Sequence, residues 1–369
     1  MIYADNAATT YFKPPQMIEA VSAYLAHPGN PGRGSNHMAM DAARSVLDTR
    51  IKLADFFDCD FRRVVFNGGI TESLNTVIQG LFTPEDHVIT TYMEHNSVLR
   101  PLYRLGCRLS ICDGSVKEIK ELLRPDTKAV IINHVSNVTG EINDIGAVGA
   151  FCRENDILSV ADTAQSAGAV PVSMKADQLD ILCFTGHKGL LAMQGVGGIC
   201  IGEGIDIRPL KVGGSGFRTF DRNQPCEYPS VLEAGTLNVP GIISIGASLD
   251  YINERGISDI LDHERRLADE FCRLLKMTDE KERVTFYGDP GKQKTGIVSL
   301  NIEGCDAGRL SDILSHEYEI ETRAGAHCAP LMHRRYGTES MLRFSFGLNN
   351  TEEDVHRCAE ALAAAGGLA

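Results

Sequence analysis

The chain has 369 residues, of which 43% are hydrophobic and 23% are charged, and its formal net charge at pH 7 is -13. A chain of this length buries a large core in about two or three domains, and its negative charge argues against nucleic acid, which favours basic surfaces. No apolar run is long enough to span a membrane, and we expect no secretory signal because the N-terminus lacks a basic start and an apolar core.

Apolar runs alternate with helical patterns between about residues 40 and 250. Several of these runs are continuously apolar, which is typical of strands in a sheet that helices cover on both faces. Between them, Glu72–Leu81 places its apolar side chains on one face and predicts a helix. The alternation predicts an α/β fold with a mostly parallel sheet. The predicted strands are Val64–Phe66, His87–Thr91, Ala129–His134, Leu158–Asp162, Ile181–Thr185 and Gly198–Gly202.

The pattern changes near residue 250. Ile252–Met277 predicts one long charged helix, and Thr351-Glu352-Glu353-Asp354 predicts the acidic first turn of the last helix. Between them we expect strands at Val298–Ile302 and Met341–Phe346 and a helix at Ser311–Glu317. We therefore expect a large α/β domain over residues 13–251 and a smaller α+β domain over residues 252–369, which residues 1–12 join.

A glycine-rich turn, Asn67-Gly68-Gly69-Ile70-Thr71-Glu72, follows the first predicted strand and opens a helix. Backbone N–H groups and the helix N-terminus favour an anion such as a phosphate at such a turn. The simpler interpretation is a tight turn with Thr71 as the N-cap of the helix. The turn is neither a Walker loop nor G-x-G-x-x-G, which disfavours nucleotide binding.

Three more polar side chains follow predicted strands: His95, Asp162 and Lys188. Taken singly, they read as a loop histidine, a helix cap and a solvated lysine. Ligands of parallel α/β sheets bind beyond the carboxyl ends of the strands, so the shared placement indicates one site. A poorly solvated lysine is a nucleophile toward carbonyls, and a lysine with an aspartate for a pyridinium nitrogen is what a pyridoxal 5'-phosphate site requires.

These residues carry a resemblance that extends nearly end to end. Tyr3-Ala4-Asp5-Asn6-Ala7-Ala8-Thr9, Thr185-Gly186-His187-Lys188 and Arg323-Ala324-Gly325-Ala326-His327-Cys328-Ala329-Pro330 resemble motifs of the fold type I pyridoxal phosphate enzymes in the class V aminotransferase superfamily. More narrowly, the chain resembles the cysteine desulfurases of group II, the selenocysteine-lyase-like branch. The resemblance implies a large domain with a mostly parallel sheet and a smaller α+β C-terminal domain.

The resemblance also implies roles for residues around the cofactor. Lys188 would form the Schiff base, Asp162 would pair with the pyridine nitrogen, Gln165 with the ring hydroxyl, and His95 would stack on the ring. The phosphate would be held by Ile70, through its backbone, and by Thr71, Thr185 and His187. Thr236 lies in Glu233-Ala234-Gly235-Thr236-Leu237-Asn238 and would reach the phosphate of a partner subunit, which implies a homodimer.

For the substrate, the resemblance implies that Asn137, Arg323 and Arg343 orient the carboxylate and that Cys328 is the nucleophile. Arg323 and His327 would favour the reactive thiolate of Cys328, although a free cysteine is commonly a buried small hydrophobe. His95 and His327 would carry protons. The chain departs from the family pattern at Ile70, Asn96 and Ala326 and after Lys188, which leaves the preferred substrate open.

The implied function is removal of sulfur from L-cysteine, giving L-alanine and a persulfide on Cys328 that a sulfur-acceptor protein takes up. The alternatives are a selenocysteine lyase, an aminotransferase or β-lyase, and a scaffold that binds the cofactor without turnover. The eleven cysteines contain no C-x-x-C pair, so we expect a cytoplasmic protein without disulfides and without a metal site.

Overall fold

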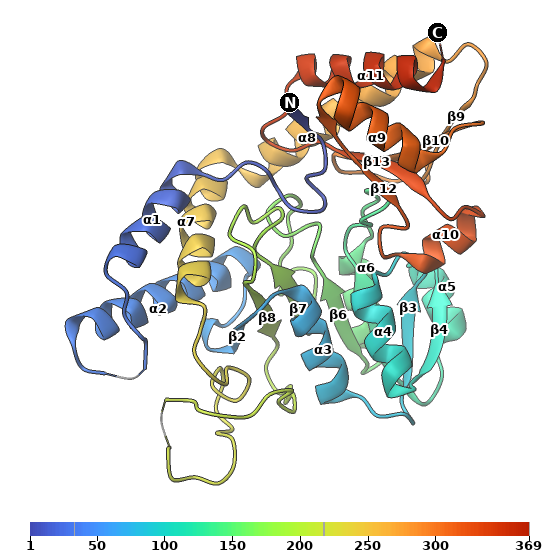
Figure 1. Cartoon of the computed structure of the whole chain (residues 1–369). Helices are drawn as coiled ribbons and strands as arrows, with labels where there is room; N and C mark the ends of the chain where they lie inside the picture. The colour runs from blue at the N-terminus through green and yellow to red at the C-terminus, as the bar shows by residue number, and fades with distance from the viewer. Residues whose placement is uncertain (33, 217, 369) are drawn as a thin grey trace.

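The computed structural model describes residues 1–32, 34–216 and 218–368. Its centre is a seven-stranded sheet with strand order β2-β8-β7-β6-β5-β3-β4 (Figure 1). β8 runs antiparallel to β2 and β7, and the other neighbouring pairs are parallel. The mostly parallel α/β sheet is therefore confirmed. The strands are β2 (Val64–Asn67), β3 (His87–Thr91), β4 (Arg108–Cys112), β5 (Thr127–Asn133), β6 (Leu158–Asp162), β7 (Ile181–Thr185) and β8 (Gly197–Ile201).

The predicted strands agree with the structure best where both faces are buried. β3, β6 and β7 have the predicted bounds, and β8 begins one residue earlier than predicted. β4 was not predicted, because this edge strand exposes Arg108 and Ile111 and lacks an apolar run.

Helices cover both faces of this sheet (Figure 1). Alternate residues of β2 divide between the two faces, since Val64 and Phe66 belong to one buried cluster and Val65 to the other. The first cluster includes α2 (His37–Phe57), α5 (Val116–Leu122), α6 (Ile145–Glu154) and α7 (Val239–Arg255), and α1 (Pro15–Ala26) packs on α7. The second includes α3 (Ile70–Leu81) and α4 (Asn96–Leu105).

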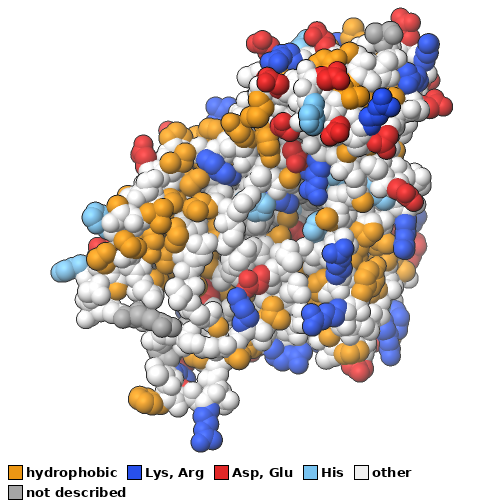
Figure 2. Space-filling model, viewed as in Figure 1, with side chains coloured by type: hydrophobic (Ala, Val, Ile, Leu, Met, Phe, Trp, Pro, Cys, Tyr) orange, Lys and Arg blue, Asp and Glu red, His pale blue; other side chains and the backbone are white. Residues whose placement is uncertain are grey.

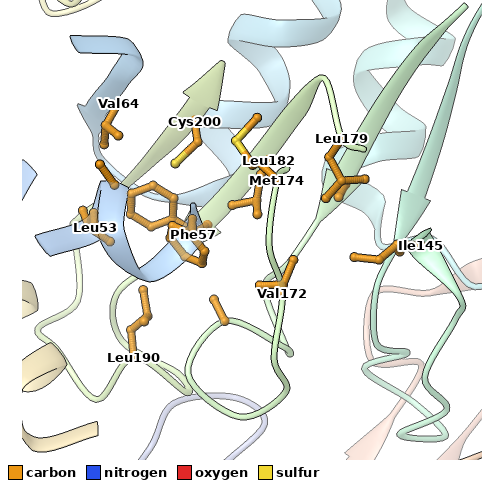
Figure 3. Close-up of a cluster of buried hydrophobic side chains, with 14 of the residues drawn as sticks. Leu53, Phe57, Val64, Ile145, Val172, Met174, Leu179, Leu182, Leu190 and Cys200 are labelled. Carbon is orange, nitrogen blue, oxygen red and sulfur yellow. The ribbon is translucent and has the colours of Figure 1, made fainter. Parts of the chain in front are cut away.

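The first cluster also fixes the chain beyond β7. Leu190 is fully buried in the same cluster as Phe57 and Leu182 (Figure 3), and the rings of Phe57 and Phe184 are 5.4 Å apart. Burial of a leucine side chain contributes about 1.5–3 kcal/mol. Because Leu190 lies two residues after Lys188, its burial holds the turn that carries this lysine.

The C-terminal part has its own sheet and core. β12 (Arg323–Gly325), β13 (Met341–Ser345), β10 (Ile297–Ile302) and β9 (Val284–Phe286) form an antiparallel sheet in that order. This C-terminal sheet packs on α8 (Ile257–Thr278), α9 (Ala307–Tyr318) and α11 (Glu352–Gly366) around Phe271 and Phe344. α11 begins with the acidic turn that the sequence predicts, closed by a Thr351–Asp354 capping box.

The prediction of one helix over Ile252–Met277 is wrong. Gly256, at φ 87°, ends α7 and precedes α8, so that range spans the last turn of one helix and most of the next. A left-handed glycine is a common C-terminal helix cap.

The N-terminus lies against the C-terminal sheet. β1 (Ile2–Tyr3) pairs in parallel with β11 (Ile320–Glu321), and Asp5 forms a bridge with Ser345. The domain boundaries 13–251 and 252–369 stay a prediction. Across the described ranges, no helix combines the length and the apolar character that crossing a membrane requires.

Candidate active site

The carboxyl ends of the parallel strands open into a cavity of about 240 Å³ between the large sheet and the C-terminal sheet. Asn133, Asp162 and Cys183 lie in register on neighbouring strands, so side chains that end β5 and β6 are brought to the same edge. Most of the predicted site residues line this one cavity: Ile70, Thr71, His95, Asn137, Asp162, Gln165, His187, Lys188, Arg323, His327 and Arg343.

Three predicted site residues do not line it. Thr185 is buried behind the wall, near Gly69. Cys328 is exposed beside the buried His327. Thr236 is exposed on the loop before α7, so within one chain it reaches no part of this cavity.

Lys188 and Asp162 form the charged centre of the cavity. Burial lowers the pKa of the Lys188 amine to about 8, helped by Arg343 and Arg323, while Asp162 acts in the opposite direction. Burial raises the pKa of Asp162, against the effects of the Ala164 N–H, which donates to Oδ1 at 2.9 Å, and of Lys188. A lysine in this setting has a substantial neutral fraction near pH 7 to 8, and the neutral amine is the nucleophile.

The glycine-rich turn has the form of an anion site. α3 begins at Ile70 with Gly69 as N-cap, so the interpretation of Thr71 as the N-cap is wrong. Gly69 has φ 124°, which favours glycine, and a Cβ there would lie 3.4 Å from Thr185 Oγ1. The amides of Ile70 and Thr71 belong to the first turn of α3, whose N–H groups have no acceptor within the helix.

His95 is the N-cap of α4. Its Nδ1 accepts the Ser97 backbone N–H at 3.0 Å, so the neutral ring carries its proton on Nε2. Burial lowers the pKa of His95 to about 4, and Lys188 adds to this effect, so the ring is neutral at pH 7. Ser97, which the sequence reasoning missed, also lies 2.8 Å from the Thr71 hydroxyl and links the two loops.

Arg343 is almost completely buried and is held from two sides. One guanidinium nitrogen donates to the Asn137 carbonyl at 2.8 Å, and another donates to Asp5 Oδ1 at 2.8 Å. Its Nε has no protein partner among the described residues. Asp5 belongs to the N-terminal motif but was not predicted as a site residue, and its bridge to Ser345 brings it beside Arg343.

The turn that carries Cys328 has an unusual backbone. His327 and Cys328 have φ of 46° and 57°, a conformation that costs on the order of 1 kcal/mol for each non-glycine residue. Asn137 Nδ2 donates to the His327 carbonyl at 2.7 Å, and the Asn96 N–H donates to the Cys328 carbonyl at 2.7 Å. These bonds fix the backbone of the turn on which His327 lines the cavity and Cys328 is exposed.

His327 supplies no positive charge that would favour the Cys328 thiolate at pH 7. Burial and the neighbouring Arg343 lower the pKa of His327 to about 3, although its bond to the Met341 carbonyl opposes the shift. His327 is therefore neutral at pH 7 and contributes no positive charge. Arg323 remains as the predicted cation beside this turn.

Two other polar residues near the cavity were missed. Asn133 ends β5 and lines the cavity, and the strand-end rule that selected Asp162 would have found it. Glu94 is fully buried, and its Oε1 accepts the Thr91 hydroxyl at 2.7 Å and the Asn133 N–H at 2.9 Å. Burial and the nearby Asp162 raise the pKa of Glu94 to about 8.

Gln165 lines the cavity from the loop that follows β6. Its Nε2 donates to the Ala7 carbonyl at 2.9 Å. The segment that begins at Tyr3 therefore closes one side of the cavity. In the same segment, the Thr10 hydroxyl lies 3.1 Å from the carbonyls of both His187 and Lys188, to which it donates.

Comparisons with known proteins agree with this geometry. Residues 2–358 match the aminotransferase class-V family. The chain is 31% identical to a probable cysteine desulfurase of Methanothermobacter thermautotrophicus, over 100% of this chain and 95% of that protein. It is 30% identical to a cysteine desulfurase of Haloferax volcanii, over 99% of this chain and 89% of that protein.

Solved structures show the same similarity. The apo structure of a cysteine desulfurase from Thermococcus onnurineus NA1 superposes with a TM-score of 0.92 at 30% identity, covering 99% of this chain and 94% of that one. The cysteine desulfurase CsdA of Escherichia coli superposes with a TM-score of 0.88 at 26% identity, covering 99% of this chain and 94% of that one.

Proposed function

The chain belongs to the aminotransferase class-V family and is a pyridoxal 5'-phosphate-dependent cysteine desulfurase, and we propose that Lys188 holds its cofactor and that Cys328 receives sulfur from L-cysteine. The observation that carries the proposal is one cavity lined by Lys188, Asp162, Arg343 and His327, the residue that precedes the exposed Cys328. The selenocysteine lyase, aminotransferase and non-enzymatic alternatives lack a relative of comparable similarity among the proteins described above.

The residues of the cavity fit a phosphorylated pyridine aldehyde. Gly69 leaves open the space that a Cβ would take beside Thr185, next to the first turn of α3, where a phosphate is favoured. The buried Nδ1 of His187 has no protein partner among the described residues, so it remains available to a ligand. Lys188 would hold the aldehyde, Asp162 would face the ring nitrogen, Gln165 the hydroxyl, and Ile70, Thr71, Thr185 and His187 the phosphate.

When bound, the cofactor supplies an aldehyde that links to amines and a ring that withdraws electrons from the substrate Cα. Arg343 would hold the substrate carboxylate, and its orientation is set by Asp5 and the Asn137 carbonyl. Arg323 lines the same cavity and adds a second cation. Lys188, whose pKa is about 8, would remove the Cα proton once its amine is free.

His95 would pack against the ring as a neutral imidazole with its proton on Nε2. The low pKa values of His95, about 4, and of His327, about 3, make either ring a weak base at pH 7. We therefore assign the main proton transfer to Lys188 and leave the two histidines as sources of hydrogen bonds.

The thiolate of Cys328 would attack the sulfur of the substrate. The S–S bond of the persulfide forms as the Cβ–S bond breaks, and Cβ gains a proton, so that cysteine and the enzyme thiol give alanine and the enzyme persulfide without an external oxidant. Exposure of Cys328 next to His327, which lines the cavity, favours this role for Cys328 over the other cysteines, several of which are buried.

Alanine and sulfide formed from L-cysteine, in the presence of dithiothreitol, test the proposal. Cys328→Ala should lose nearly all turnover of cysteine but keep the cofactor on Lys188. Cys226→Ala is the matched control, because Cys226 is also exposed and lies outside the cavity. Full turnover by Cys328→Ala would reject the role assigned to Cys328, and activity toward selenocysteine alone would favour the lyase alternative.

A second copy of the chain would cover the apolar surface of α1, α2 and the loop before α7. Figure 2 shows hydrophobic side chains gathered over the region of α1 and α2. This surface exposes Ile18, Leu25, Met38, Met40, Leu47, Ile51, Val212 and Phe220. Apolar patches of this kind mark interfaces, and a homodimer would bring Thr236 toward the partner's cavity. Sedimentation equilibrium tests the homodimer, because it should give twice the mass of one chain.

A cytoplasmic location is also proposed. All eleven cysteines are free thiols, which agrees with a reducing compartment. Fractionation of cells that produce the protein would test this location directly.

A further inference from the structure

Two segments of the chain that meet at Cys328 carry arginine and no carboxylate. Residues 95–112 and 322–338 contain six arginines and neither lysine, aspartate nor glutamate. At the average of the chain, 49 acidic residues in 369, these 35 positions would hold about five. The basic character is therefore local and opposes the overall charge of -13. The six residues are Arg100, Arg104, Arg108, Arg323, Arg334 and Arg335.

The fold brings the helices that carry four of these arginines next to the turn of Cys328. The Asn96 N–H, at the start of α4, bonds to the Cys328 carbonyl at 2.7 Å. Arg100 and Arg104 follow Asn96 by four and eight residues, so they lie on the same side of α4, about 6 and 12 Å further along its axis. On the other side, α10 (Pro330–Tyr336) begins two residues after Cys328 and carries Arg334 and Arg335.

These four residues with Tyr103 form what we call the arginine patch. All four arginines are exposed, and Tyr103 is 56% exposed between Arg100 and Arg104. In Figure 2, basic side chains gather over the half of the large sheet that α4 covers in Figure 1, with few acidic ones among them. The Arg335 guanidinium lies 4.2 Å from the centre of the Tyr92 ring, which fixes its direction.

Of the carboxylates near these segments, Asp126 and Glu72 are paired, whereas the exposed Glu339, which follows α10, forms no ion pair in the part of the chain that the structure describes. Asp126 accepts from Arg108 and Arg124 at 2.8 Å, and Glu72 pairs with Lys211 at 2.5 Å. Of the ion pairs within the described ranges, none uses Arg100, Arg104 or Arg334. Asp113 lies near Arg335 and offsets part of its charge. The patch therefore keeps a net positive charge beside the thiol.

We propose that the arginine patch docks an acidic protein surface that surrounds the thiol receiving sulfur from Cys328. This inference rests on the function proposed above. Arginine binds carboxylates in a planar, two-pronged geometry, and arginine and tyrosine are the residues most often found at the energetic centres of protein interfaces. A small thiol needs no such surface, whereas a protein partner gains both attraction and orientation from it.

The transfer at this surface conserves atoms and electrons. The acceptor thiolate attacks the outer sulfur of the Cys328 persulfide, a new S–S bond forms on the acceptor, and the S–S bond of the enzyme breaks. Cys328 leaves as a thiolate, and the transferred sulfur keeps its proton and becomes the outer sulfur of the acceptor persulfide. The free Cys328 is then ready for another substrate, so no oxidant or reductant is consumed.

Three synthetic peptides test the inference with the intact enzyme. Each has one central cysteine, flanked on both sides by glutamate, serine or lysine. After loading with L-cysteine, the rate of persulfide formation on each peptide is measured by mass spectrometry at low and at high salt. At low salt the glutamate peptide should react at least about 10-fold faster than the lysine peptide, and the ratio should fall as salt screens the charges.

Charge reversal on the patch sharpens the test. Arg100→Glu/Arg104→Glu should abolish or invert the preference for the glutamate peptide. Arg309→Glu/Arg357→Glu is the matched control, because it makes the same change of charge at exposed positions of α9 and α11, and it should keep the preference. Alanine production with dithiothreitol should be equal in all three proteins.

Two results would overturn the inference while leaving the proposed function intact: equal rates for the three peptides, or the same preference after charge reversal on the patch. A change in the sedimentation mass of Arg100→Glu/Arg104→Glu would instead assign the patch to a contact between copies of this chain, and would also overturn it. Absence of alanine from the unaltered enzyme would refute the proposed function itself.

Discussion

The lowered pKa of Lys188 has a measurable consequence for its reaction with an aldehyde. An ordinary lysine has a pKa of about 10.4, so about 1 amine in 2,500 is neutral at pH 7. With a pKa of about 8, roughly 1 in 10 of the Lys188 amines is neutral at that pH. Because only the neutral amine attacks a carbonyl, we expect Lys188 to react about 200-fold faster at pH 7 than an ordinary lysine, with no advantage left near pH 11.

The assay uses apoprotein and short pulses of pyridoxal 5'-phosphate between about pH 6.5 and 11, each stopped with borohydride. Peptide mapping then gives the label on Lys188 relative to Lys128, which is exposed on β5. The ratio removes the pH dependence of the aldehyde itself. It should be highest at low pH and fall mainly between about pH 8 and 10.

A change at Asp162 should move this profile. The Asp162 charge raises the pKa of Lys188, so Asp162→Asn should lower that pKa further and shift the fall in the ratio to lower pH. Asp269→Asn, at an exposed position of α8, is the control and should leave the profile in place. A ratio that stays constant across the whole range, in the unaltered protein, would refute the reasoning about burial and charge.

Two further predictions concern residues beside the cavity. Burial and Asp162 raise the pKa of Glu94 to about 8, so the unaltered protein loses stability as the pH rises from about 4.5 to 8. Glu94→Gln should avoid this loss. The free energy of unfolding of the variant minus that of the unaltered protein, measured by calorimetry, should therefore be larger at pH 8.5 than at pH 4.5 by on the order of 4 kcal/mol. The same value of this difference at both pH values would contradict the prediction. Asp5→Ala should raise the KM for L-cysteine by roughly 10-fold with little change in kcat, because Arg343 loses one of its two hydrogen-bond partners. Asp5→Asn keeps an acceptor oxygen, so its KM should lie much closer to that of the unaltered enzyme. Equal KM values for the two Asp5 variants would argue against orientation through this bond.

The sequence predicted the buried strands well because their signal is local. β3, β6 and β7 are short apolar runs, and in a sheet covered on both faces such a run is sufficient to mark a strand. β4 escaped because an edge strand alternates with solvent, and the break between α7 and α8 escaped because one glycine interrupts an otherwise continuous helical pattern.

The site shows the same division between local and distant information. The motif around Lys188 and the strand-end positions of His95 and Asp162 are visible in the chain, and their side chains do share one cavity. The partnership of Asp5 with Arg343 joins residues 338 positions apart, so no spacing rule reveals it. The neutral state of His327 depends on its burial beneath Arg343, which a sequence does not record.

The turn that carries Cys328 is continuous with β12 of the C-terminal sheet, yet its carbonyls are bonded to Asn96, at the start of α4, and to Asn137, after β5, both in the part of the chain that forms the large sheet. Separation of the large sheet from the C-terminal sheet would break these two hydrogen bonds. The position of the exposed Cys328 therefore depends on contacts with both layers, although the turn belongs to the chain of only one of them.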